Sequence, residues 1–138
     1  MFDPPIIAVV EDDDALREAL SDLLQVVGLS CRTYAKAESF LAANAPGAFS
    51  CLITDVRLPG ISGLDLLERL RGLGSTMPVI VITSYTDPGI CSRAMASGAQ
   101  AYLTKPLADN VLLQHLKRAL GRNASIDARD YEGRVRDD

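Results

Sequence analysis

Residues 6–12 read Ile6-Ile7-Ala8-Val9-Val10-Glu11-Asp12, a continuous apolar run that ends in two acids. An uninterrupted β-rich run of this length is typical of a strand that is covered on both faces, as in a parallel sheet. A helix is predicted next, because apolar residues recur there at helical spacing: Leu16, Leu20, Leu23, Leu24 and Val27. Gly28 ends this helix. The start of the chain therefore predicts a strand–helix unit with an acidic turn in its middle.

The same alternation continues along the chain. Further strands are predicted at residues 30–34, 51–54, 79–82 and 101–103. Further helices are predicted at residues 36–43, 64–70, 87–98 and 112–120, and Asp87-Pro88 is a typical helix start. Five strands that alternate with five helices at this spacing predict an α/β fold. Its parallel sheet would be buried on both faces and joined by right-handed crossovers.

Length and composition are those of one globular domain. The chain has 138 residues and a net charge of −4, which argues against binding nucleic acid or an anionic membrane. We expect residues 1–121 to form the domain. Residues 122–138 are expected to be a polar tail or the start of a linker in a longer regulator, because apolar residues are sparse there. Their arginines are balanced by acids, which does not favour a nucleic-acid arm.

Cysteine and histidine usage gives no sign of a redox or zinc site. Cys31, Cys51 and Cys91 are widely spaced, so we expect buried or bystander thiols. His115 is expected to be solvated, with no titratable partner. The first residues lack the pattern of a secretory signal, and no apolar run is long enough to span a bilayer. The prediction is a cytoplasmic protein.

Reactive side chains follow four of the five predicted strands. Glu11 and Asp12 follow the first strand, Asp55 follows the third, Thr83 follows the fourth, and Lys105 follows the fifth. In open α/β sheets, ligands bind beyond the carboxyl ends of the strands, near the point where the strand order reverses. We therefore expect these side chains to converge at one edge of the sheet.

Simple electrostatics restricts what such a cluster can do. Two carboxylates ~4 Å apart repel by about 4 kcal/mol at an effective dielectric constant near 20, so the acids must either take up protons or bind a cation. Oxygen ligands favour Mg²⁺, with Mn²⁺ as an alternative ion. An ionised Asp55 is also a competent nucleophile toward phosphorus. Lys105 and the Thr83 hydroxyl would then stabilise the phosphoryl oxygens.

Four segments resemble those of a known family, the receiver domains of two-component response regulators. The segments are Val9-Val10-Glu11-Asp12, Thr54-Asp55-Val56-Arg57-Leu58-Pro59-Gly60-Ile61-Ser62-Gly63, Val79-Ile80-Val81-Ile82-Thr83-Ser84 and Gly98-Ala99-Gln100-Ala101-Tyr102-Leu103-Thr104-Lys105-Pro106. They occur in order, with the family's spacing, over about residues 5–120. The second segment is similar to the receivers of FixJ-type transcriptional regulators. The resemblance implies a doubly wound, flavodoxin-like sheet with strand order 2-1-3-4-5.

The resemblance also implies roles for single residues. Asp55 would accept a phosphoryl group from a sensor histidine kinase. Asp12 and Asp55 would ligate Mg²⁺ directly, Glu11 would act through water, and the backbone carbonyl of Arg57 would complete the set. Thr83 and Lys105 would contact the phosphate.

On the same resemblance, Tyr102 would swing inward when Thr83 moves toward the phosphate, and the Lys105–Pro106 peptide bond would be cis. Phosphorylation would switch an output face made of the fourth helix, the fifth strand and the fifth helix. That face would support a homodimer or an effector protein and so regulate transcription. The chain would be a phosphoacceptor that assists its own phosphorylation and dephosphorylation, and not an enzyme in the usual sense.

Other interpretations remain open at this point. Acids favour the first turn of a helix, and Asp13 and Asp14 are expected to do only that. A haloacid-dehalogenase-like phosphatase also uses an Asp nucleophile with Mg²⁺, but it needs a second Asp where this chain has Arg57. A nucleotide-binding Rossmann domain needs a glycine-rich first turn, and this turn is acidic. An interaction module that never becomes phosphorylated is the third alternative.

Overall fold

The computed structural model describes residues 5–84 and 87–121, and the predicted tail at residues 122–138 lies outside this part. The strands are β1 (Ile6–Val10), β2 (Ser30–Tyr34), β3 (Cys51–Asp55), β4 (Val79–Thr83) and β5 (Ala101–Thr104). The helices are α1 (Asp14–Val26), α2 (Ala37–Ala43), α3 (Gly63–Gly72), α4 (Pro88–Ala96) and α5 (Asp109–Leu120). The predicted alternation is confirmed. Three strands extend one residue further than predicted, to Asp55, Thr83 and Thr104.

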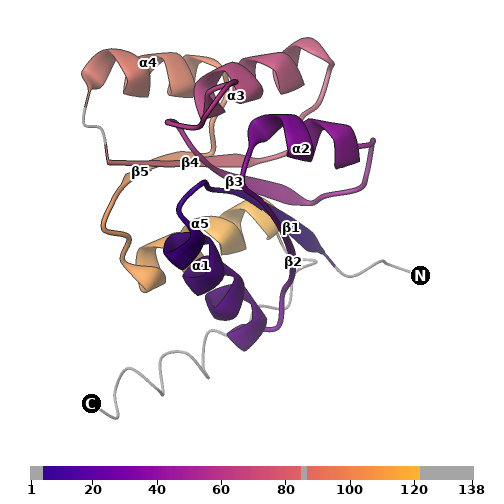
Figure 1. Cartoon of the computed structure of the whole chain (residues 1–138), viewed down its shortest axis with the longest axis vertical. Coiled ribbons are helices and arrows are strands. Elements are labelled where there is room, and N and C mark those ends of the chain that lie inside the picture. Colours follow the sequence, from indigo (N-terminus) through magenta and orange to yellow (C-terminus); the bar gives the residue numbers. More distant parts are fainter. Residues whose placement is uncertain (1–4, 85–86, 122–138) are drawn as a thin grey trace.

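The sheet has five parallel strands in the order β2-β1-β3-β4-β5, as predicted. Helices α1 and α5 cover one face of the sheet, and α2, α3 and α4 cover the other (Figure 1). Side chains of β1, β3 and β4 point alternately into these two cores, which explains their continuous apolar runs. Burial on both faces does not extend to β2, where Ser30, Arg32 and Thr33 are exposed, because β2 lies at the edge of the sheet.

The predicted helix signals have clear structural roles. The Asp13 carboxylate caps α1 by accepting hydrogen bonds from the amides of Ala15 and Leu16. Gly28 follows α1 with φ of +84°, a conformation that favours glycine. Asp87 caps α4, and Pro88 is the first residue of that helix. Helix α4 ends at Ala96, slightly before the predicted end at Gly98.

Helix α4 is attached more lightly than its neighbours. Ala94 is its one buried residue among residues 88–96, and Met95 is 48% exposed. The Arg71 guanidinium of α3 donates hydrogen bonds to the carbonyls of Ser97 and Gly98, at 3.1 and 3.0 Å, and so ties down the C-terminal end of α4. The N-terminal end of α4, next to β4, has no such clamp in the described residues. The helix is therefore fixed mainly at the end far from the polar strand termini.

His115 and the cysteines lie in surroundings that the sequence pattern describes only in part. The expectation that His115 is solvated is wrong, because it is only partly exposed and its Nδ1 atom is buried without a hydrogen-bond partner among residues 5–84 and 87–121. The three cysteines are free, and burial raises the pKa of the Cys51 thiol to about 12. In the described part of the chain, no helix has both the length and the apolar character that crossing a bilayer requires.

Gly63 is the place where α3 meets the end of β3. A Cβ atom added to Gly63 would lie 1.8 Å from the carbonyl oxygen of Asp55, which is backbone and cannot rotate away. The Gly63 amide donates to the Val56 carbonyl at 2.9 Å, so the two segments are also bonded to each other. The absence of a side chain at Gly63 thus allows the close contact that fixes the end of β3.

We predict that Gly63→Ala lowers the free energy of unfolding by about 1–3 kcal/mol, because the added methyl group must displace backbone. The matched control is Gly72→Ala in the same helix, where an added Cβ would meet nothing within 4 Å. That control should be neutral or stabilising by up to about 1 kcal/mol. Urea denaturation monitored by circular dichroism measures both. Equal stabilities for the two variants would show that the close contact is not a constraint.

Candidate functional site

The parallel register brings the predicted site residues to one edge of the sheet. Val10 of β1 lies opposite Thr54 of β3, Asp55 lies opposite Ile82 of β4, and Thr83 lies opposite Thr104 of β5. The residues that follow or end these strands must therefore emerge together. They are Glu11, Asp12, Asp55, Thr83 and Lys105.

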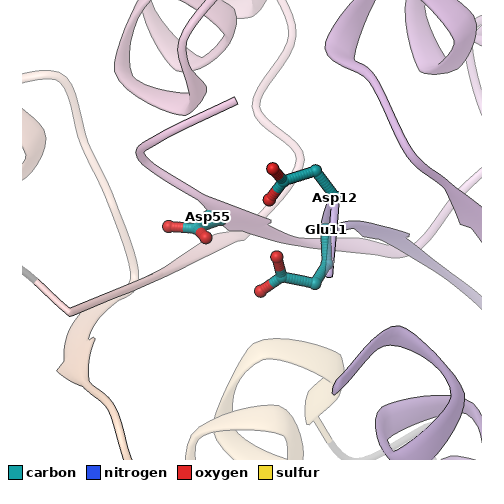
Figure 2. A group of neighbouring side chains, drawn as sticks. All are labelled: Glu11, Asp12 and Asp55. Carbon is teal, nitrogen blue, oxygen red and sulfur yellow. The ribbon is translucent and has the colours of Figure 1, made fainter. Parts of the chain in front are cut away.

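The acids form a compact cluster. Each of Glu11, Asp12 and Asp55 offers a carboxylate oxygen, and these oxygens lie within 4.8 Å of one another. Figure 2 shows the carboxylates of Glu11 and Asp12 extending from the turn after β1 toward the end of β3, where Asp55 lies. Glu11 is 0% exposed and Asp55 is 5% exposed, whereas Asp12 is open to solvent. The cluster therefore has two buried members and one accessible member.

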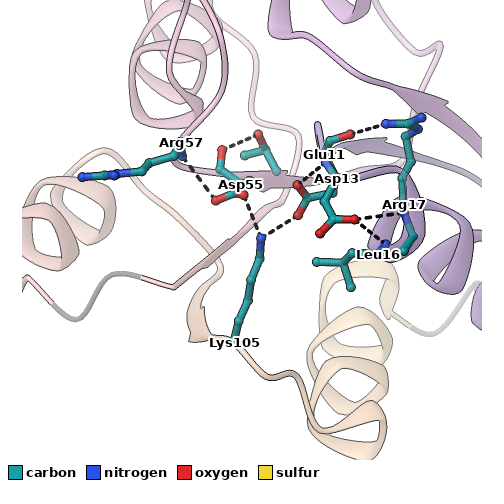
Figure 3. Close-up of polar contacts among 9 residues, drawn as sticks. Glu11, Asp13, Leu16, Arg17, Asp55, Arg57 and Lys105 are labelled. Atoms are coloured by element: carbon teal, nitrogen blue, oxygen red, sulfur yellow. Dashed lines mark hydrogen bonds and ion pairs between the residues drawn. The ribbon is translucent and has the colours of Figure 1, made fainter.

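Lys105 bridges the two buried acids. Its Nζ atom lies 2.7 Å from Glu11 Oε1 and 2.8 Å from Asp55 Oδ2 (Figure 3). Burial alone would lower the pKa of the Lys105 ammonium, but the bonds to Asp55 and Glu11 outweigh it and raise the pKa above 10.5. Sequence reasoning placed Lys105 near the phosphoryl position, away from the metal, and did not foresee its contact with Glu11.

The Glu11 carboxylate is buried, and burial disfavours its charged form. Burial raises the pKa of its carboxyl above 4.5, and the hydrogen bonds from Lys105 and from the Asp13 amide oppose this only in part. The nearby Asp55 carboxylate raises the pKa further. One ammonium for three clustered carboxylates leaves an excess of negative charge at this edge.

Backbone groups orient the acids. The Asp13 amide donates to Glu11 Oε2 at 3.0 Å, and the Arg57 amide donates to Asp55 Oδ1 at 3.2 Å. The Thr54 hydroxyl donates to the carbonyl of Asp55 at 3.0 Å. Sequence reasoning missed the role of Thr54. A threonine directly before Asp55 in an otherwise apolar strand was the available signal.

The remaining predicted residues also lie around this edge. Thr83 is 0% exposed, and its carbonyl accepts a hydrogen bond from the Lys105 amide at 2.8 Å. The Lys105–Pro106 peptide bond is cis. Tyr102 is partly buried against the core under α4, where burial raises the pKa of its hydroxyl, with smaller contributions from Cys91 and Asp87 of the α4 region. Tyr102 thus connects the site's strand to α4.

The donor set fits a hard divalent cation. All ligand atoms of the cluster are carboxylate oxygens, which Mg²⁺ and Mn²⁺ prefer, and the excess negative charge favours a cation. The exposed Asp12 leaves one side of the cluster open, as an ion that keeps several waters requires. The backbone of Arg57 lies beside the Asp55 carboxylate, because its amide bonds to that group.

Comparison with known proteins decides the family. A profile described as "Response regulator receiver domain" matches residues 7–117, which is most of the chain. The chain belongs to this family. Membership decides against the dehalogenase-like phosphatase and the Rossmann domain, and it makes the chain a receiver domain of two-component signalling.

Individual relatives and solved structures support the same family. The chain is 42% identical to the transcriptional regulatory protein FixJ of Azorhizobium caulinodans, over 91% of this chain and 62% of that protein. A response regulator receiver protein of Pseudoalteromonas atlantica has a similar crystal structure, with a TM-score of 0.79, 31% identity, and coverage of 84% of this chain and 97% of that one. The BeF3-activated DrrB receiver domain matches with a TM-score of 0.78 and 31% identity, over 87% of this chain and 100% of that one.

The receiver structures are matched along almost their whole length, whereas the curated relatives are longer. The chain spans about half to two thirds of their length, for example 62% of the Azorhizobium FixJ and 52% of nodulation protein W of Bradyrhizobium diazoefficiens.

The ion pairs of Lys105 generate a prediction. We expect Lys105→Met to lower the free energy of unfolding by about 2–3 kcal/mol at pH 7, because Glu11 would then be buried without a cation. The deficit should narrow as the pH falls toward 4.5, since a protonated Glu11 needs no partner. In the wild type, the ion pairs of Lys105 contribute fully to stability below pH 10.5, the ordinary pKa of lysine. This contribution is lost as the pH rises through the raised pKa that Lys105 has in the folded protein.

Denaturation at pH 5 and pH 7 measures this effect. Lys36→Met, at an exposed lysine whose side chain makes no capping bond, is the matched control and should change stability by less than about 0.5 kcal/mol. A Lys105→Met deficit that is the same at both pH values would contradict the assignment to Glu11.

Proposed function

We propose that this domain is a phosphorylation switch in which Asp55 takes a phosphoryl group from a phosphohistidine of a sensor histidine kinase. The observation that carries the proposal is the position of the Asp55 carboxylate. Asp55 is the last residue of β3, and its carboxylate lies close to those of Glu11 and Asp12 and 2.8 Å from the Lys105 ammonium. A nucleophile flanked by a cation-binding set and an ammonium fits the charge changes of phosphoryl transfer.

In the proposed transfer, Asp55 takes the place of the histidine nitrogen on phosphorus. An oxygen of Asp55 forms a bond to phosphorus while the phosphorus–nitrogen bond to histidine breaks, and the histidine nitrogen leaves with the bonding electron pair and takes up a proton. Lys105 shifts from the carboxylate toward one phosphoryl oxygen, and the Thr83 hydroxyl donates to another. Water later attacks the acyl phosphate, which releases inorganic phosphate and restores the carboxylate.

A divalent ion, Mg²⁺ or Mn²⁺, would neutralise the phosphoryl oxygens when bound. Asp12 and Asp55 would hold it directly, together with the Arg57 carbonyl, and Glu11 would act through water. The carboxylate cluster within 4.8 Å and the exposure of Asp12 support this assignment. The ion would also relieve the repulsion among these acids.

Phosphorylation would be transmitted through Thr83 and Tyr102 to α4, β5 and α5. Moving an equilibrium from 1:99 to 99:1 takes about 5.5 kcal/mol of differential interaction. Bonds from Lys105 and Thr83 to a charged phosphoryl group would each supply ~1.5–3 kcal/mol of that. The single buried residue of α4 supports this helix as the moving element, since little packing has to be broken.

The output would be a homodimer or an effector contact on this face. The name of one relative, transcriptional regulatory protein FixJ, supports a role in transcription, exerted through a missing or separate effector. Residues 122–138 would then lead into a linker, and the protein would act in the cytoplasm, as the sequence predicts. Nucleic acid and membrane would not be direct partners of this domain.

The phosphoacceptor is tested by mass spectrometry after incubation with acetyl phosphate and Mg²⁺. We predict that the wild type gains one phosphoryl group and that Asp55→Asn gains none, because an amide is a poor nucleophile. Asp22→Asn, an exposed acid on α1, is the control and should be labelled like the wild type. Labelling of Asp55→Asn to the same extent would refute the assignment.

The cation site is tested by thermal unfolding with and without Mg²⁺. Asp12→Asn should raise the melting temperature in the absence of metal, because one of three repelling carboxylates is lost. It should also lose most of the stabilisation that Mg²⁺ gives the wild type. A variant that Mg²⁺ stabilises as strongly as the wild type would place the ion elsewhere.

A further inference from the structure

Asp12 differs from the other two acids in how it is held. Lys105 and backbone amides fix the carboxylates of Glu11 and Asp55. The Asp12 side chain is exposed and makes no hydrogen bond or ion pair within residues 5–84 and 87–121. Its position must therefore come from the backbone that carries it.

That backbone is held by an arginine from α1. Arg17 Nη1 donates to the carbonyl oxygen of Glu11 at 2.8 Å (Figure 3). Its Nη2 atom pairs with the Asp14 carboxylate. The Arg17 side chain is 21% exposed, so its guanidinium is largely packed into the turn. The carbonyl of Glu11 and the amide nitrogen of Asp12 belong to one planar peptide group. Fixing that carbonyl orients the peptide from which the Asp12 side chain departs.

The turn has few other restraints. The Glu11 amide donates to the Tyr34 carbonyl at 3.0 Å, and the Asp13 amide donates to Glu11 Oε2. Neither bond involves the Glu11–Asp12 peptide group. Arg17 is thus the residue that restrains this peptide in the described part of the chain.

We infer that Arg17 is a positioning residue for the cation site, which acts through the Glu11 carbonyl to pre-orient Asp12. The inference deepens the proposed function and rests on it, because it assumes that Asp12 is a metal ligand. Residues behind the ligands of metal sites commonly affect affinity by 10–100-fold when they are changed.

The charge of Arg17 and its positioning of Asp12 predict opposite effects on Mg²⁺ binding when Arg17 is replaced. Arg17 carries a positive charge close to a site for a positive ion. If charge were its main effect, removing it would tighten binding of Mg²⁺. If its main effect is to position Asp12, removing it weakens binding. Lysine separates the two further, because it keeps the charge but lacks the planar fork that serves the carbonyl and Asp14 together.

The experiment is a titration of the metal-free protein with magnesium chloride, followed by amide NMR. We expect Arg17→Gln and Arg17→Lys to raise the dissociation constant by about 10-fold or more. The amide signals of Asp12 and Asp13 should also shift in the metal-free variants. Arg32→Gln on β2 removes one charge at an exposed arginine and is the matched control. Its dissociation constant should stay within about twofold of the wild type.

The Mg²⁺ affinities of the wild type and the two Arg17 variants decide whether Arg17 positions Asp12. Weaker binding by both Arg17 variants, with melting temperatures that show folded protein, supports positioning. Unchanged or tighter Mg²⁺ binding by Arg17→Gln overturns the positioning role of Arg17. The role is also overturned if Arg17→Lys binds Mg²⁺ with the affinity of the wild type while the affinity of Arg17→Gln changes. A wild type that does not bind Mg²⁺ overturns the proposed cation site together with this inference, whereas normal wild-type binding with unaffected Arg17 variants overturns only the inference.

Discussion

The buried charge of Glu11 is the constraint on which the site depends. Its carboxylate is fully shielded from solvent beside Asp55, and Lys105 supplies the compensating ammonium. Neighbouring strands lie about 4.8 Å apart, so β5 is roughly 10 Å from β3 across β4. A side chain from the end of β5 must be long to reach Asp55 and Glu11, and the four-carbon stem of lysine provides that length. The strand order therefore requires a side chain as long as lysine at position 105.

Two contacts with the backbone also help to position the acids. Gly63 lets the start of α3 lie directly against the Asp55 carbonyl, and Arg17 holds the turn that carries Asp12. Both act on main chain and not on the reactive groups themselves. The acids are thus brought together by the sheet and aimed by the first turns of α1 and α3. The C-terminal end of α4 is held separately, by hydrogen bonds from Arg71 to the carbonyls of Ser97 and Gly98.

Much of this arrangement could be predicted from the sequence. The apolar runs of β1, β3 and β4 and the leucine spacing of α1 and α5 gave the elements, because burial on both faces leaves a clear pattern. The convergence of the acids with Lys105 followed from the parallel sheet. The pairing of Lys105 with Glu11, the bond from Arg17 and the close contact of Gly63 could not be predicted, since they depend on loop geometry that leaves no periodic signal. The exposure of β2 and the partial burial of His115 depend on neighbouring elements in space, which a single chain pattern does not reveal.

The central claim is that one edge of the sheet holds a cation and a phosphoryl group against Asp55. A crystal structure grown with Mg²⁺ and beryllofluoride tests it most directly. The account predicts beryllium bonded to a carboxylate oxygen of Asp55 and an ion about 2.0–2.1 Å from oxygens of Asp12, Asp55 and the Arg57 carbonyl. Lys105 should have left Asp55 for a fluorine atom. Beryllofluoride bound elsewhere, or an Asp55 that keeps its present contact with Lys105 under saturating conditions, would contradict it.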